Sequence, residues 1–170
     1  MDVGRAELYN VYLPLFKAAL DAGCDVVMTS FVAVDRVPCV CNDFLLNRIL
    51  RREWGQNVMT ISDYDDVRQL MNQGVAADLK ECAQLAIEGG LDVDFLSLAY
   101  LTQLKGLVEE GTVPEALVDA ACLRMLELKN RLGLFEKPVK NDDPAYAAEV
   151  CARKEHRRQS LETALRSCVL

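Results

Sequence analysis

A carboxylate directly after a short apolar run is the residue of this sequence best placed to do chemistry. Residues 57–62 read Asn-Val-Met-Thr-Ile-Ser, and Asp63 and Tyr64 follow them. This pattern predicts a buried strand, with a helix that begins at Asp66. In α/β proteins, polar residues at the carboxyl ends of parallel strands face the mouth where substrates bind. Asp63 is therefore a candidate catalytic residue. The alternative is that it caps the following helix, because Asp is a favoured N-cap residue.

Composition limits the classes of protein to consider. The chain has 170 residues, 51% of them hydrophobic, which predicts one folded domain with a real core. The net charge of −7, with no basic stripe before the tail, argues against a nucleic-acid partner. No apolar run reaches the ~18 residues of a membrane span. The amino-terminal residues have no apolar signal core, so the sequence predicts no secretory signal and, by default, a cytoplasmic location.

Seven cysteines are present, at irregular spacing. An odd, irregular set does not predict a disulfide framework, and a reducing compartment is the simpler interpretation. Cys39 and Cys41 together with Cys24 could bind a metal in principle. No second Cys or His pair stands at zinc spacing, however, so neither a metal nor another cofactor is predicted.

The elements that must position Asp63 alternate between strands and helices. Strands are predicted at 25–32, 58–62 and 91–96, and residues 33–42 as a loop. Helices are predicted at 13–22, 43–53, 66–73, 78–88, 100–110 and 112–132, with a linker at 141–144 and a charged helical tail from 145. Strands separated by helices imply parallel pairing. Three strands are too few for an eight-stranded barrel and would leave bare sheet edges, so the chain is expected to be part of something larger.

Several segments, in this order, resemble the family-3 glycoside hydrolases, the β-glucosidase family. Residues 12–19 resemble the family's YLPPFKAA segment, and residues 27–31 its VMxSY/F strand. Residues 61–64, Ile-Ser-Asp-Tyr, resemble its SDW/SDH nucleophile strand, and residues 126–135 its LxxKxRLGLFE segment. Each motif alone is weak, but the ordered set covers nearly the whole chain and is specific.

The resemblance implies a partial (β/α)₈ TIM-like barrel with a helical carboxyl-terminal tail. Residues 1–138 would be the closing part of the barrel domain, and residues 139–170 a linker and tail that lead toward a second domain. The implied activity is retaining hydrolysis of β-linked glycosides or oligosaccharides, with no cofactor. Asp63 matches the nucleophile, and Ser30, Phe31 and Tyr64 fall at substrate-binding positions.

This sequence also departs from the family pattern. Residues 30–38 replace the family's SFNxxNGxP and lack both asparagines and the glycine, with Arg36 where a turn needs a residue that easily takes positive φ. The loop beside the site is therefore expected to differ. The retaining mechanism needs a second carboxyl group about 5 Å from the nucleophile, and Asp65 and Asp66 are too close in sequence to be assigned that part. The chain is thus expected to be a fragment, with a complementary protein segment as a candidate partner.

Other interpretations stay open. The chain could be a non-catalytic remnant, or one half of a split glycosidase. Residues 63–67 also fit the DxDx(T/V) pattern of haloacid-dehalogenase-like phosphatases, in which Asp63 would attack phosphate and magnesium would hold it. Asp92 and Asp94 flank a predicted strand, and one of them could line the mouth beside Asp63 or serve the structure. His156 lies in the charged tail, where a solvated surface is expected.

Overall fold

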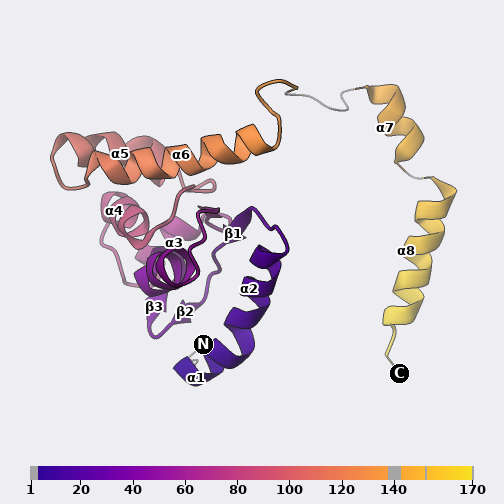
Figure 1. Ribbon diagram of the computed structural model, residues 1–170, viewed down its shortest axis with the longest axis horizontal. Coiled ribbons are helices and arrows are strands. Elements are labelled where there is room, and N and C mark those ends of the chain that lie inside the picture. The colour runs from indigo at the N-terminus through magenta and orange to yellow at the C-terminus, as the bar shows by residue number, and fades with distance from the viewer. Residues whose placement is uncertain (1–3, 138–142, 152, 170) are drawn as a thin grey trace. The chain divides into compact units, whose positions relative to one another are not determined.

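The computed structural model describes residues 4–137, 143–151 and 153–169. They fall into two compact units, Met1–Lys129 and Asn130–Leu170; Figure 1 shows the order of the elements along the chain. The predicted domain boundary at 138 and the first half of the predicted linker, residues 141–142, lie outside the described residues.

The first unit begins with helical backbone that runs without a break through α1 (Arg5–Glu7), η1 (Leu8–Tyr12) and α2 (Leu13–Asp21). η1 is wound as a π-helix, in which the N–H of Leu13 donates to the carbonyl of Leu8. Pro14, in the first turn of α2, has no N–H of its own to donate. The wider winding before it lets the helix continue through the proline. The predicted helix start at Leu13 therefore divides one continuous helical run.

The sheet is smaller than the sequence predicted. β1 (Val26–Met28) pairs in parallel with β4 (Met59–Ile61), and the predicted third strand is reduced to one parallel bridge between Ile61 and Val93. The prediction of a strand over 91–96 was wrong because ladder pairing is limited to Val93 and the backbone bends from Leu96. Leu96 and Leu98 have φ values of 75° and 63°, which are incompatible with an extended strand.

The segment predicted as a loop contains a small hairpin. β2 (Ala33–Val34) pairs antiparallel with β3 (Val37–Pro38), and the 3₁₀ turn η2 (Cys39–Cys41) follows. The two turn residues, Asp35 and Arg36, have φ values of 54° and 65°. A two-residue hairpin turn with positive φ at both positions matches the twist of its strands. The backbone thus adopts the left-handed conformation at Asp35 and Arg36, although the sequence has no glycine in this turn.

Helices supply most of the first unit. They are η3 (Phe44–Glu53), α3 (Asp66–Asn72), α4 (Leu79–Gly89), α5 (Ala99–Glu109) and α6 (Glu115–Arg131). Their bounds lie close to those predicted, because the apolar periodicity and the glycines after the helices are strong signals. The side-chain oxygen of Asn42, which stands two residues before η3, accepts a hydrogen bond from the N–H of Leu45 at 3.1 Å and so satisfies a donor in the first turn of this helix.

The largest core cluster lies among α3, α4 and α5. Small residues such as Ala83, Ala86 and Ala99 are fully buried in it beside Leu70 and Leu107. Gly89 shows how close the approach is, because a Cβ there would lie 2.6 Å from the backbone of Cys41. The small side chains let the helices pack at short distance.

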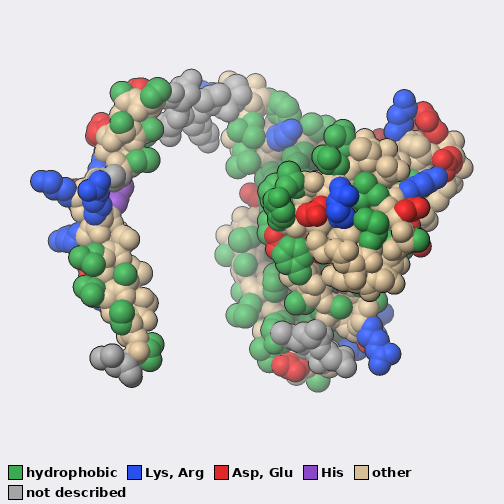
Figure 2. Space-filling model, turned by 180° about the vertical axis from the view of Figure 1, so that it is seen from behind, with side chains coloured by type: hydrophobic (Ala, Val, Ile, Leu, Met, Phe, Trp, Pro, Cys, Tyr) green, Lys and Arg blue, Asp and Glu red, His purple; other side chains and the backbone are tan. Residues whose placement is uncertain are grey.

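The second unit contains α7 (Pro144–Val150) and α8 (Lys154–Ser167), two helices where the sequence predicted a helical tail. Asp143 caps α7 by accepting a hydrogen bond from the N–H of Ala145 at 2.8 Å. Lys and Arg side chains gather toward the start of α8 together with the single histidine, His156, which is exposed (Figure 2). In the described part of the chain, no helix has both the length and the apolar character needed to cross a bilayer.

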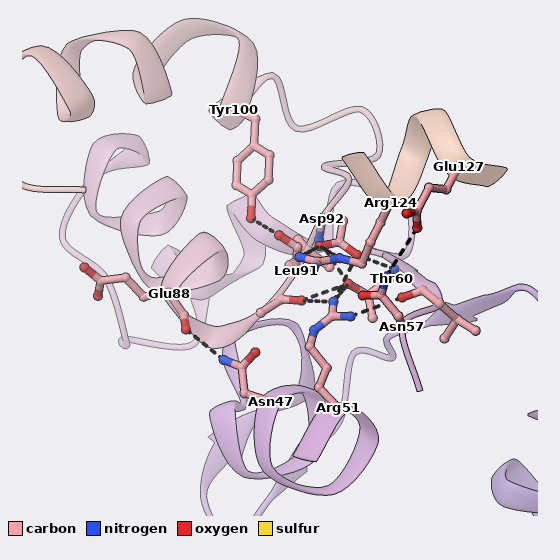
Figure 3. A network of polar contacts seen from close by, with 12 residues as sticks. Asn47, Arg51, Asn57, Thr60, Glu88, Leu91, Asp92, Tyr100, Arg124 and Glu127 are labelled. Carbon is pink, nitrogen blue, oxygen red and sulfur yellow. Dashed lines mark hydrogen bonds and ion pairs between the residues drawn. The ribbon is translucent and has the colours of Figure 1, made fainter. Parts of the chain in front are cut away.

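A buried carboxylate joins four segments of the first unit (Figure 3). The Asp92 side chain is 1% exposed and accepts bonds from two guanidinium groups, that of Arg51 at 3.0 Å and that of Arg124 at 2.9 and 2.6 Å. It also accepts a bond from the N–H of Thr60 at 2.8 Å. η3, β4, the bridge segment and α6 therefore meet at one charge. Burial lowers the pKa of Arg51, the carboxylate of Asp92 raises it in opposition, and Arg124 lowers it further.

We predict that Asp92→Ala lowers the free energy of unfolding by about 3–5 kcal/mol, because it leaves two arginines largely buried without their anion. Urea unfolding followed by circular dichroism measures the loss. Asp21→Ala is the matched control, because the Lys17–Asp21 pair is half exposed and its removal should cost less than about 1 kcal/mol. Equal effects of the two substitutions would contradict a central role for Asp92.

Candidate active site

The ends of three neighbouring segments lie at one edge of the short sheet. The N–H of Thr29 donates to the carbonyl of Ile61 at 2.8 Å, and the N–H of Ser62 donates to the carbonyl of Val93 at 3.0 Å. Because the pairing is parallel, the residues that follow β1, β4 and Val93 all leave the sheet at its carboxyl edge. That edge is where α/β folds place their ligands.

Asp63 follows β4 at this edge and is partly buried. Its Oδ1 accepts a hydrogen bond from the N–H of Tyr64 at 2.6 Å, while Oδ2 accepts none within the described residues. The N-cap position of α3 is held by Asp65, which has a φ of 55°. The alternative in which the side chain of Asp63 caps α3 is therefore not what the structure shows. One carboxylate oxygen is oriented by the backbone, and the other is left for a ligand.

Ser62 fixes the turn that carries Asp63. Its hydroxyl accepts a hydrogen bond from the N–H of Phe95 at 2.8 Å and donates to the carbonyl of Asp63 at 3.0 Å. The N–H of Asp65 adds a bond to the carbonyl of Phe95 at 3.0 Å. Two of these bonds hold the segment after β4 against the segment after Val93, and the third lies within the turn of Asp63.

Exposed aromatic rings stand at the same edge. Phe31 follows β1 and is 49% exposed, and Tyr64 follows Asp63 and is 60% exposed. Phe95 follows Val93, is also exposed, and packs edge-to-face on Tyr64 with ring centres 6.2 Å apart. Aromatic faces exposed beside a carboxylate suit the apolar side of a sugar ring. Phe95 was not among the residues selected from the sequence, although an aromatic residue near the end of the predicted third strand was a usable signal.

Ser30 lies after β1 in the same parallel register as Asp63, is exposed, and is hydrogen-bonded to the thiol of Cys39. Burial raises the pKa of Cys39, an effect that the Ser30 bond opposes, and burial raises the pKa of Cys41 to about 11. Both thiols are therefore weak metal ligands and weak nucleophiles. Over residues 4–137, 143–151 and 153–169, no three His, Cys, Asp or Glu side chains come together as a cation site.

The other carboxyl groups near the edge are engaged. Asp65 pairs with Arg68 at 3.1 Å. Asp94 accepts hydrogen bonds from the Ser97 hydroxyl at 2.6 Å and from the N–H of Tyr100 at 3.1 Å, which serves the start of α5. Together with the anchoring of Asp92, these contacts decide the open question about Asp92 and Asp94 in favour of structural roles.

Comparison with known proteins agrees with this geometry. Residues 1–128 match the Glycosyl hydrolase family 3 N terminal domain. This chain belongs to glycoside hydrolase family 3. It is 33% identical over its full length to a periplasmic beta-glucosidase of Salmonella typhimurium, and 33% identical to a beta-xylosidase of Formosa agariphila. It covers 23% and 24% of these two relatives, so it spans about a quarter of their length.

Solved β-glucosidase structures share the arrangement. A β-glucosidase from Listeria innocua superposes with a TM-score of 0.86 at 40% identity, over 92% of this chain and 22% of that one. A β-glucosidase from Erythrobacter marinus gives a TM-score of 0.84 at 36% identity, over 92% of this chain and 21% of that one. The family-3 N-terminal domain has a TIM-barrel-like α/β fold, and this chain is an α/β structure, mostly helical with few strands, that superposes on part of such proteins. The match does not favour the phosphatase interpretation of residues 63–67.

We predict that Tyr64 and Phe95 are energetically coupled. A double-mutant cycle with Tyr64→Ala and Phe95→Ala should give a coupling free energy near the lower end of about 0.5–1.5 kcal/mol, because the edge-to-face pair is partly solvated. Urea unfolding of the four proteins measures it. The pair Tyr64→Ala and Leu101→Ala is the control, since Leu101 is 80% exposed on α5. A cycle that closes additively for Tyr64 and Phe95 would refute the coupling.

Proposed function

We propose that this chain carries the nucleophile segment of a retaining β-glycosidase, with Asp63 as the nucleophile. The supporting observation is the position of Asp63 after a parallel strand, at the sheet edge that also holds the segment after β1. In this proposal Asp63 Oδ2 attacks the anomeric carbon of a β-linked glycoside and displaces the leaving group. Water then hydrolyses the covalent glycosyl-enzyme, and the configuration is retained.

The neighbouring residues receive positioning roles in the proposal. The rings of Phe31 and Tyr64 form walls of the sugar site, and the hydroxyl of Ser30 offers a hydrogen bond to a sugar hydroxyl. A β-glucosidase of Listeria innocua, to which this chain is 41% identical, has been solved in complex with laminaribiose. We infer β-linked glucosides of this kind as the substrate class. Xylosides are the second candidate, because of the likeness to xylosidases.

The acid and base of the reaction must come from other residues. Within the described residues, Asp65 and Asp94 are held by their own partners at this edge, and Asp66 is 1% exposed. A retaining mechanism requires a carboxyl group about 5–5.5 Å from the nucleophile. We propose that a segment outside these residues supplies it. Residues 139–170 would then connect the barrel portion, residues 1–138, to a second domain.

Substitution of the nucleophile tests the proposal. Asp63→Ala should reduce hydrolysis of an aryl β-glucoside by roughly 10³-fold or more, because covalent attack is lost. Asp65→Ala is the matched control, since that side chain is held by Arg68. Proton NMR of the first-formed product should show the β-anomer. If the folded chain, or its assembly with a complementary segment, shows no hydrolysis that depends on Asp63, the remnant interpretation replaces this one.

The outer edge of β1 is the second feature that supports a partial barrel. The backbone of Asp25 and Thr29 bonds to β4, so strand alternation turns the N–H and C=O groups of Val26 and Met28 to the other side. Within the described residues no strand pairs with that side. Both side chains are exposed, at 37% and 51%. A bare apolar edge of this kind is a template for another strand.

An apolar cavity of about 270 Å³ lies beside the same edge. It is lined mainly by hydrophobic side chains of α2, β1 and η3, among them Phe16, Leu20, Met28, Ile49 and Trp54. Apolar side chains that line an unfilled space are a cost to the folded unit. We propose that the preceding strand of a (β/α)₈ barrel pairs with β1 and fills this cavity, which makes a complementary barrel segment the partner of the chain.

Complementation tests the partner. The barrel portion that precedes the matched quarter in the Listeria innocua β-glucosidase should bind this chain in sedimentation experiments. Met28→Lys should weaken binding at least tenfold, equivalent to about 1.4 kcal/mol, because it places a charge at the apolar edge. Leu101→Lys, on exposed α5, is the matched control. Equal binding by both variants would show that β1 is not the docking edge.

A further inference from the structure

Asp66 is a buried carboxyl group for which the proposed mechanism has no use. It is the first residue of α3 and is 1% exposed, whereas Asp63, three positions earlier, is only partly buried. A buried carboxylate is costly unless charge or hydrogen bonds compensate it. The contacts that hold this buried carboxyl group in place therefore matter for its role.

The contacts of Asp66 join both sides of the site edge. Its Oδ2 accepts a hydrogen bond from the hydroxyl of Thr29 at 3.1 Å, and Thr29, at the end of β1, is 7% exposed. The N–H of Asp66 donates to the carbonyl of Asp63 at 3.2 Å and closes the turn that carries the nucleophile candidate. One residue thus holds the Asp63 turn with its backbone and the end of β1 with its side chain.

No positive charge compensates this carboxyl group. Among the described residues, Asp66 forms no ion pair, and the ionisable groups whose charges couple to it are Asp63, Cys39 and Cys41. Burial is the main cause that raises the pKa of Asp66 above its ordinary value, and the negative charge of Asp63 raises it further. The hydroxyl of Thr29 acts in the opposite direction, because it donates to the charged form.

We propose that Asp66 is a positioning residue for Asp63: through Thr29, its buried carboxyl group fixes the Asp63 turn beside the end of β1. The name "nucleophile" for Asp63 depends on the proposed function, but the link itself does not. Burial and the negative charge of Asp63 both favour the protonated form of Asp66, whereas the hydroxyl of Thr29 favours its charged form.

The direction of the pH dependence follows from the burial. A group whose pKa is raised in the folded state contributes stability below its ordinary pKa, here 3.8, and that contribution is lost as the pH rises through the folded value. The free energy of unfolding of the wild-type protein should therefore fall as the pH rises from 3.8 through the raised pKa of Asp66. Asp66→Asn keeps the shape without the charge, so this loss should be reduced in the variant.

Carboxyl-carbon NMR of the folded 170-residue chain tests the link directly. We expect Asp66 to titrate above 3.8 in the wild type, lower in Asp63→Asn, where a charge is removed, and higher in Thr29→Val, where a hydrogen bond is removed. Thr29→Ser, which keeps the hydroxyl, should restore the wild-type titration. The amide resonances of Asp63 and Tyr64 should move in Asp66→Ala and Thr29→Val, and should keep their low-pH wild-type positions in Asp66→Asn.

The outcomes separate this inference from the proposed function. Titration of Asp66 at or below 3.8, or Asp63 and Tyr64 amides that do not respond to Thr29→Val, would overturn the positioning role whether or not the chain hydrolyses glycosides. If these NMR results hold but hydrolysis never depends on Asp63, the link stands and the glycosidase assignment fails. In active assemblies, Asp66→Asn should change the acid limb of the rate–pH profile, which a purely structural role would not move.

Discussion

The first unit depends on one buried negative charge. Asp92 gathers Arg51 from η3, Arg124 from α6 and the backbone of Thr60 from β4 around a carboxylate that is 1% exposed. The hydroxyl of Thr60 completes the arrangement by donating to the carbonyl of Gly90 at 2.9 Å. Because β1 and β4 are only three residues long, ladder hydrogen bonds alone cannot fix their neighbours. The Asp92 cluster supplies directional contacts in their place, and each partner is costly to leave unpaired.

The site edge lies next to the Asp92 cluster in the chain. Asp92 lies before Val93, and Asp94 and Phe95 lie after it, so the same short segment carries the anchor and part of the site wall. Ser62 then joins the turn of Asp63 to Phe95 through its hydroxyl. Glycosidase chemistry requires a carboxylate held in a defined position at an open surface. In this chain, polar contacts on both sides of a very short strand hold the turn of Asp63.

Several differences between sequence and structure have one physical origin. Periodicity reports which residues are buried, but not where the backbone turns. The alternation of apolar and acidic residues at 91–96 therefore predicted a strand. The backbone is instead bent, with positive φ at Leu96 and Leu98 and with contacts of Asp94 to Ser97 and Tyr100. In the hairpin at 33–38, pairing of Val34 with Val37 imposes the left-handed turn on Asp35 and Arg36. In both places, contacts between residues three to six positions apart set the course of the backbone, and hydrophobic periodicity does not report them.

The sequence by itself determined the helices, the parallel order of β1 and β4, the family, and Asp63 as the residue to consider first. Those features depend on apolar spacing and on motifs that are local in the chain. Only the tertiary structure decided that Asp92 is an anchor, that Phe95 stands beside Tyr64 and that Asp66 is buried against Thr29. It also decided that, in the described part of the chain, no strand pairs with the outer edge of β1 beside a cavity. Each of these depends on side chains about 30 or more positions apart, or on the side of a strand that stays unpaired. Spacing along the chain carries no record of such contacts, because they arise only when separate elements pack together.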